Sequence, residues 1–192
     1  MSFGIDKDHP AMQVEIDKAY AKKILMFAAA SNSGRNRPVP FPARTNEVFC
    51  IFATDGKGAP YNGNPELGNA DCHFATLGVA VKSAWPEGLL DDHDGEQSGE
   101  RRTTGTSFAT PIAAGIAAYI LGFAREQDID EESYRMLRTH AGMKKIFTEL
   151  LVQKGEGLDY ICPWQLFASY RKDAKHVLFL IRDALAAWVG TL

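Results

Sequence analysis

The chain has 192 residues, of which 45% are hydrophobic and 23% are charged, and its formal net charge is −3. This length suits one globular domain with a single core and is short for two. The mild acidity, with no basic run or basic amphipathic helix, argues against a binder of nucleic acid or of a membrane surface. The three cysteines are odd in number and widely spaced, which fits neither a disulfide framework nor a zinc site and favours a reducing, intracellular setting.

The amino-terminal part of the chain predicts a strand–helix–strand unit. Residues 1–4 read as the end of a strand, and residues 10–23 have the apolar spacing of a helix with Pro10 in its first turn. Residues 24–30 form an unbroken apolar run that stops at the polar residues 31–34, as a parallel strand buried on both faces does. The first residues lack the basic and apolar regions of a secretory signal.

Two further strands are predicted at residues 47–54, which end at the turn 55–58, and at residues 74–83. The fold class that follows is α/β, with a largely parallel sheet and helices on both sides. Residues 87–102 read as an exposed, charged loop. Its acidic cluster at residues 91–94 matches no known metal loop, so we expect a solvated surface there, no metal site and no cofactor.

The central stretch, residues 105–115, places a serine at the start of a helix predicted over residues 107–126. A hydroxyl in this position has around it backbone N–H groups without intrahelical acceptors, which suit a developing negative charge. This geometry favours a nucleophilic Ser107, and the alternative is a capping serine before a buried, alanine-rich helix. The longest apolar stretch, residues 111–124, is too short and too glycine-rich to span a bilayer, so we expect a soluble chain.

The carboxyl-terminal part reads as helical. Its predicted helices cover residues 131–138, 142–154 and 173–188, and the last has a continuous apolar face that we expect to pack against the domain. The chain therefore divides into an α/β part, residues 1–126, and a helical extension, residues 127–192.

Three motifs resemble one known family. Residues 105–115 agree at every constrained position with the serine signature of the subtilisin-like peptidases, Gly-Thr-Ser-x-Ala-[Thr/Ser]-Pro-x-[Ala/Val]-[Ala/Ser]-Gly. Residues 28–34 resemble the subtilase segment in which an asparagine follows a buried strand, and residues 2–4 resemble its Ser-Leu-Gly segment. The resemblance covers residues 1 to about 125 and corresponds to the second half of a subtilase catalytic domain.

The resemblance implies a serine endopeptidase that acts on a polypeptide substrate through an acyl-enzyme. It makes Ser107 the nucleophile and gives the oxyanion two donors, the Asn32 side-chain amide and the Ser107 N–H. The residues implied to line the primary specificity pocket or pair with the substrate are Ser2, Phe3, Gly4, Ala30 and Ser31.

The other catalytic motifs of the family are not recognisable. Subtilases carry their triad in the order Asp, His, Ser, so the aspartate and histidine motifs should precede Asn32. His9 is the only histidine before Asn32 and lacks the His-Gly-Thr context. We expect a surface or structural role for it and for the remaining histidines, His73, His93, His140 and His176. The chain alone is therefore expected to be very weakly active or inactive.

The sequence leaves open where the missing motifs lie and whether the chain is part of an enzyme at all. Met1 directly before Ser-Phe-Gly is typical of an internal methionine in this family, so we expect the missing motifs in an amino-terminal portion of the same protein. The alternative is a non-catalytic remnant that binds a peptide or protein partner through residues 2–4 or the last helix. An unrelated α/β binding domain is the third possibility.

Overall fold

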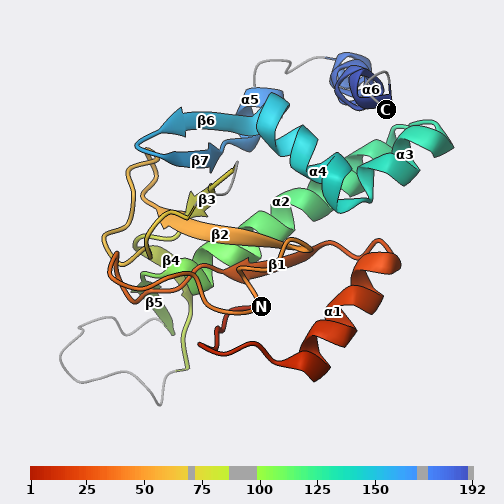
Figure 1. Ribbon diagram of the computed structural model, residues 1–192. Coiled ribbons are helices and arrows are strands. Elements are labelled where there is room, and N and C mark those ends of the chain that lie inside the picture. The colour runs from red at the N-terminus through yellow and green to blue at the C-terminus, as the bar shows by residue number, and fades with distance from the viewer. Residues whose placement is uncertain (69–71, 87–98, 168–172, 190–192) are drawn as a thin grey trace.

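A five-stranded sheet lies at the centre of the fold in the computed structural model, which describes residues 1–68, 72–86, 99–167 and 173–189 without the side chains of 187–189 (Figure 1). Its strand order is β1-β2-β3-β7-β6. The pairs β1–β2, β2–β3 and β3–β7 are parallel, and the pair β7–β6 is antiparallel. The strands are β1 (Met26–Ala29), β2 (Val48–Thr54), β3 (Phe74–Leu77), β6 (Val152–Gly155) and β7 (Leu158–Ile161). The predicted largely parallel sheet is confirmed.

The amino-terminal residues continue the sheet beyond β1. The Met1 amino group donates to the Phe27 carbonyl at 2.5 Å, and the Ala29 N–H donates to the Met1 carbonyl at 3.0 Å. This alternation is the hydrogen-bond pattern of a parallel pair. Residues 1–4, predicted as the end of a strand, therefore lie beside β1 where it leads into the segment that holds Asn32.

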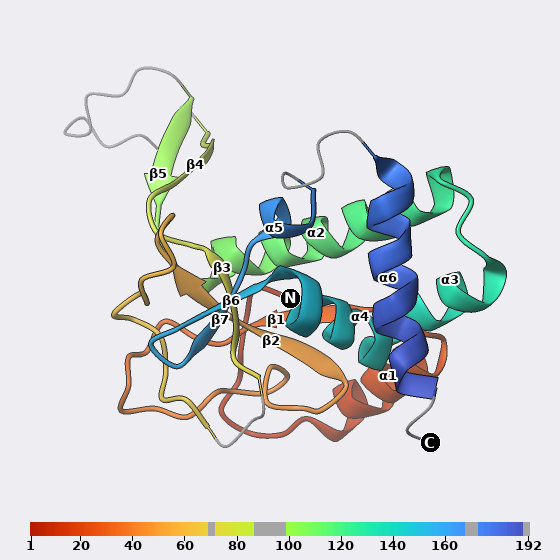
Figure 2. The same ribbon diagram turned by 90° about the horizontal axis from the view of Figure 1, so that it is seen from above.

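Helices cover both faces of the sheet, as predicted (Figures 1 and 2). The long helix α2 (Thr106–Glu126) contacts β1, β2 and β3, and its alanines let the helix and strand backbones lie close together. On the opposite face, α1 (Pro10–Ala21) buries Ile16 against Ala28 and Val48. Alternation along β2 explains this division, because Phe49 faces α2 while its neighbour Val48 faces α1.

Helix α2 is longer than the apolar stretch at residues 111–124 suggested. It has 21 residues, and an 18-residue window within it has a mean hydropathy of 1.6, so it is long and apolar enough to cross a membrane by length and composition. The expectation that this stretch is too short is therefore wrong. Core helices of soluble proteins pass the same test, and here the inward side of α2 is used in packing on the sheet.

The carboxyl-terminal part contains the three predicted helices and also a short helix, residues 163–167, and a β-hairpin that were not predicted. The helices are α3 (Glu131–Leu137), α4 (His140–Ile146), α5 (Pro163–Phe167) and α6 (Ala174–Val189). The helix predicted over 142–154 instead ends in a π-helical turn, Phe147–Leu151, and continues as β6. Glu156 and Gly157 adopt positive φ values of 45° and 80°, which reverse the chain, and β7 is then buried between β3 and β6.

The strand predicted over residues 74–83 is divided in two. After β3, the N–H groups of Gly78 and Val79 both donate to the Thr54 carbonyl, at 2.8 and 3.1 Å, and this bends the chain out of the sheet. Residues Val81–Ala84 then form β4, which pairs with β5 (Glu100–Thr103). The end of the predicted loop 87–102 is thus a strand, and the acidic cluster at 91–94 lies outside the described residues.

Candidate active site

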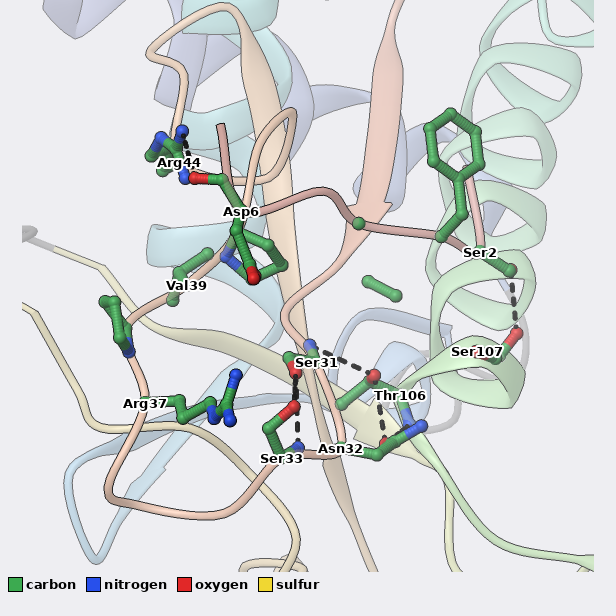
Figure 3. A pocket seen from close by; sticks show the side chains of 15 residues that line it. Ser2, Asp6, Ser31, Asn32, Ser33, Arg37, Val39, Arg44, Thr106 and Ser107 are labelled. Atoms are coloured by element: carbon green, nitrogen blue, oxygen red, sulfur yellow. Dashed lines mark hydrogen bonds between the residues drawn. The ribbon is translucent and has the colours of Figure 1, made fainter. Parts of the chain in front are cut away.

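Asn32 and the start of α2 are joined by hydrogen bonds across 74 residues of sequence. The Thr106 N–H donates to Asn32 Oδ1 at 2.8 Å, and the Thr106 hydroxyl donates to the same oxygen at 3.2 Å. The Thr106 hydroxyl also accepts from the Ser31 N–H at 3.3 Å. Because two donors face Oδ1, the orientation of the amide is fixed, and Asn32 Nδ2 has no hydrogen-bond acceptor among the described residues. Asn32 and Ser107 line the same pocket (Figure 3).

Gly105 is required where Asn32 meets the helix. Its φ is +153°, and a Cβ added there would lie 2.9 Å from Asn32 Nδ2. The Gly105 N–H donates to the Gly78 carbonyl at 2.8 Å, which anchors the entry to α2 beside the end of β3. A side chain at this position would push the amide of Asn32 away, so the first glycine of the 105–115 stretch has a steric role.

Ser107 is the second residue of α2 and is half-buried. Its N–H belongs to the first turn, whose amides have no intrahelical acceptors and lie at the positive end of the helix dipole. Pro111, four residues further on, cannot donate to the Ser107 carbonyl, and the Ser2 hydroxyl donates to that carbonyl instead, at 3.0 Å. Pro111 lies inside α2 beyond its first turn, and it leaves the Ser107 carbonyl free to accept the hydrogen bond that holds residues 2–4 next to the serine.

A pocket of about 370 Å³ lies directly beside Ser107. Its walls are residues 2–4 on one side and residues 31–33 on the other, and the loop from Arg37 to Pro40 closes the end far from Ser107 (Figure 3). The structure thus brings together six of the seven residues predicted for the site. The six lining residues are Ser2, Phe3, Gly4, Ser31, Asn32 and Ser107.

Ala30 is the predicted residue that does not line this pocket. It is fully buried, and its N–H donates to the Ile51 carbonyl at 3.0 Å, so it belongs to the sheet core. Its place in the wall is taken by Ala29. Gly4 shows why a small residue is needed opposite, because a Cβ there would lie 2.4 Å from Pro40 Cγ.

Charged side chains lie at the far end of the pocket. Arg44 donates from Nε and Nη2 to the Asp8 carboxylate, at 3.1 and 2.5 Å, and from Nη2 to the Asp6 carbonyl at 3.1 Å. Arg37 extends from the loop toward Ser33 (Figure 3). Within the described part of the chain, no hydrogen bond or ion pair holds its guanidinium.

The pocket contains no histidine among its described lining residues. His9 caps α1, where its Nδ1 accepts from the Met12 N–H at 3.2 Å, and His73 contacts the Gly68 carbonyl at 2.9 Å. His140 stacks on Phe49, with 4.1 Å between ring centroids, and burial lowers its pKa. His176 lies in the first turn of α6 and stacks with Phe179, whereas His93 lies outside the described residues.

Sequence reasoning missed several residues of this site, among them Thr106 and Arg37. Thr106 bridges Ser31 and Asn32 and is completely buried, and Arg37 faces the end of the pocket. The position of Thr106 directly before the serine, inside the matched signature, was a usable signal. Arg37 lies in a polar loop with no pattern of its own, and only the closure of that loop over the pocket gives it a place in the site.

Comparison with known proteins agrees with this geometry. The model of the subtilase family matches residues 1–159. Subtilisin DY of Bacillus licheniformis is 31% identical over 124 residues, which are 63% of this chain and 41% of that protein. Subtilisin-like protease 3 of Pseudogymnoascus destructans is 32% identical over 126 residues, 65% of this chain and 28% of that protein. The chain thus spans less than half the length of these relatives.

Solved structures give the same fold. The patellamide maturation protease PatA superposes with a TM-score of 0.64 at 18% identity, over 94% of this chain and 60% of that one. The PatG macrocyclase, solved in complex with a peptide, gives 0.64 at 18% identity, over 93% and 50%. With a family match that extends through β3 and into β7, a serine at the start of α2 and an asparagine fixed beside it, the chain belongs to the subtilase family of serine proteases.

Proposed function

We propose that the chain supplies the nucleophile and the oxyanion donors of a serine endopeptidase site. The Ser107 Oγ would attack the carbonyl carbon of a peptide bond, while a base takes its proton and later delivers it to the leaving amine. Asn32 Nδ2 and the Ser107 N–H would donate to the oxyanion. The observation that supports this proposal is the 2.8 Å bond from the Thr106 N–H to Asn32 Oδ1, which fixes the orientation of the amide in the pocket that Ser107 also lines.

The polypeptide substrate would lie between residues 2–4 and residues 31–33. The Ser2–Ser107 bond supports this placement, because it holds the segment 2–4 next to the nucleophile. Ser2, Phe3, Gly4 and Ser31 would contact the substrate, and Ala30 would support the wall from the sheet core.

The base and its orienting carboxylate are proposed to come from polypeptide outside the 192 residues. The motifs that carry them in the family are not recognisable before Asn32, and no histidine is among the described residues that line the pocket. The chain alone should therefore be very weakly active or inactive. Without a triad, the oxyanion hole and binding account for about three to four orders of magnitude over water in the subtilisin case.

Covalent labelling tests the assignment of the nucleophile. A fluorophosphonate at high concentration and long exposure should modify Ser107, identified by mass spectrometry of the tryptic peptide, and Asn32→Ala should slow the reaction. Ser83→Ala, a serine in β4 that does not line the pocket, is the matched control and should leave labelling unchanged. Modification of a different serine, or equal labelling of Ser107→Ala, would overturn the proposal.

The second candidate is a non-catalytic module that binds peptides in the same pocket. It is favoured by the pocket itself, because residues 2–4 and residues 31–33 form its walls and no histidine is among its described lining residues. A peptide that binds equally well to Ser107→Ala, together with no labelling of Ser107 in the unmodified chain, would favour this candidate over the first.

A further inference from the structure

We propose that Arg37 makes this pocket selective for an acidic side chain, aspartate or glutamate, at the substrate residue before the scissile bond. The inference rests on the proposed function, because it takes the pocket beside Ser107 as the one that receives that side chain. It goes further in naming the substrate class and the residue that selects it.

Position is the first argument. Ser107 and Arg37 lie at opposite ends of one cavity of about 370 Å³, with residues 31–33 between them (Figure 3). A side chain that enters beside Ser107 and lies along this wall points toward the guanidinium. Arginine presents several N–H donors in one plane, which match the two oxygens of a carboxylate.

The partners of the charged side chains around the pocket give the second argument. Its described lining residues include two arginines, Arg37 and Arg44, and one acidic residue, Asp6. Arg44 is already bound by the Asp8 carboxylate and the Asp6 carbonyl. Arg37 has no such partner within the described residues, so its charge remains available to a ligand.

Hydroxyl groups along the wall support the same ligand. Ser31 Oγ and Ser33 Oγ lie 2.9 Å apart, and Ser31 Oγ accepts from the Ser33 N–H at 3.2 Å. One hydroxyl of the pair donates to the other, so the proton of the second hydroxyl can turn toward an incoming carboxylate. A purely apolar side chain would meet this polar wall and the guanidinium without compensating hydrogen bonds.

Direct binding tests the inference without requiring turnover. Fluorescent peptides that differ only at this position, with Asp, Asn, Leu or Lys, are titrated with the 192-residue chain at low salt, and the anisotropy is followed. The Asp peptide should bind roughly five- to thirty-fold more tightly than the isosteric Asn peptide. The preference should shrink as salt is raised.

Substitution of Arg37 identifies the cause. Arg37→Gln should abolish the preference for the Asp peptide over the Asn peptide, whereas Arg37→Lys should keep part of that preference. Arg35→Gln is the matched control, because Arg35 lies two residues away in the same loop but lines a different cavity. An equal loss in Arg35→Gln would show a general charge effect and overturn the inference.

The remaining outcomes separate this inference from the proposed function. Equal binding of all four peptides, or tightest binding of the Lys peptide, would overturn the acidic preference and leave the peptide site standing. Failure of every peptide to bind at millimolar concentration would overturn both.

Discussion

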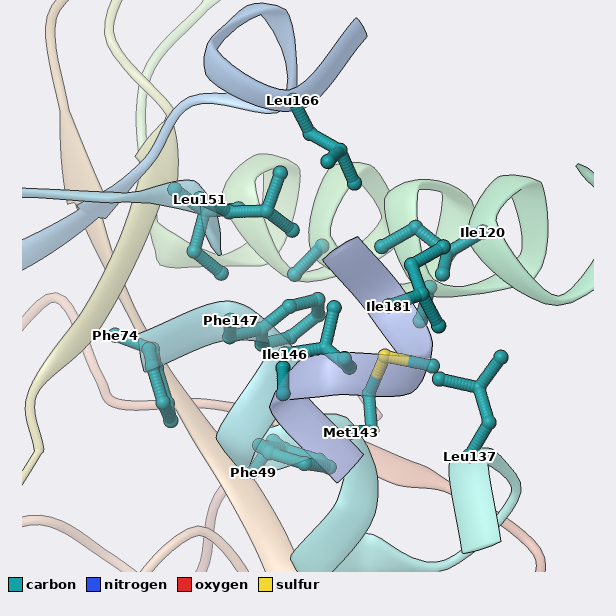
Figure 4. Packing of buried hydrophobic residues seen from close by; sticks show 14 of the residues in the cluster. Phe49, Phe74, Ile120, Leu137, Met143, Ile146, Phe147, Leu151, Leu166 and Ile181 are labelled. Carbon is teal, nitrogen blue, oxygen red and sulfur yellow. The ribbon is translucent and has the colours of Figure 1, made fainter. Parts of the chain in front are cut away.

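The start of α2 and its middle are stabilised by different interactions. At the start, Asn32, Thr106 and Gly105 are held by specific hydrogen bonds and by one close approach of backbone to side chain. In the middle, α2 contributes to an apolar core in which three phenylalanines, Phe49, Phe74 and Phe147, meet with ring centroids 5.5 to 5.9 Å apart (Figure 4). In the apolar core, a residue can be replaced by another apolar residue of similar volume. At the start of α2, the hydrogen bonds and the close approach require the particular residues that are present.

The largest effect on stability is expected in the apolar core. Phe147 is completely buried, so Phe147→Ala should lower the free energy of unfolding by about 3–5 kcal/mol, from lost burial and from the cavity that remains. Urea denaturation followed by circular dichroism measures this loss. Phe179→Ala is the matched control, since Phe179 is 61% exposed and its loss should cost little.

A smaller loss with a larger effect on the site is expected at Gly105. Gly105→Ala should cost about 1–3 kcal/mol of stability, because alanine rarely adopts this φ and its Cβ would meet the Asn32 amide. It should also slow labelling of Ser107. In Gly115→Ala the added Cβ meets nothing within 4 Å, so this variant should be neutral or slightly more stable. Equal behaviour of the two variants would remove the distinction between the start and the middle of α2.

Removal of one hydroxyl tests the polar network alone. Thr106→Val keeps the branched shape but leaves the Ser31 N–H without its acceptor and Asn32 Oδ1 with one donor fewer. We expect a loss of about 1 kcal/mol and slower labelling of Ser107. Thr148→Val removes an exposed hydroxyl that donates within its own helical segment, and should change neither quantity.

The smallest effect is expected from pH. Burial, and then the neighbouring Lys144, lower the pKa of His140 in the folded chain. Protonation therefore favours the unfolded state, so this contribution to stability is complete above the unfolded pKa of about 6.5 and is lost as the pH falls below it. His140→Phe, which can keep the stacking on Phe49, should flatten the pH dependence of unfolding between pH 5 and about 7. An unchanged dependence would show that His140 does not contribute.

The same contrast explains how far the sequence could predict the structure. The strands β1 and β2 and the start of α2 follow from apolar runs and small residues that leave few alternatives. The β6–β7 hairpin could not be predicted in this way, because residues 152–154 continue the apolar spacing of the preceding helix. They form a strand because they pair with β7, and β7 in turn pairs with β3. Local patterns carry no information on such long-range pairing.

The candidate site shows the same limit. Ser107 was predicted from its place at the start of a helix and from the serine signature, whereas Asn32 was predicted only from the resemblance of residues 28–34 to a subtilase segment. The structure joins the two through Thr106. Arg37 was not predicted, because it reaches the pocket through a loop whose path is fixed by the pairing of Ile5 with Phe41. The division at residue 126 stays a prediction, although β6 and β7 of the later part complete the sheet of the earlier part.

The rate of Ser107 labelling, with and without an added base, tests the central claim most directly. The chain is treated with a fluorophosphonate over a series of imidazole concentrations, with Ser107→Ala as the blank and an intact subtilisin as the reference. The account predicts labelling far slower than in the reference, with a rate at Ser107 that rises with imidazole. Labelling as fast as in the reference without imidazole would contradict it, because the base would then already lie within these 192 residues.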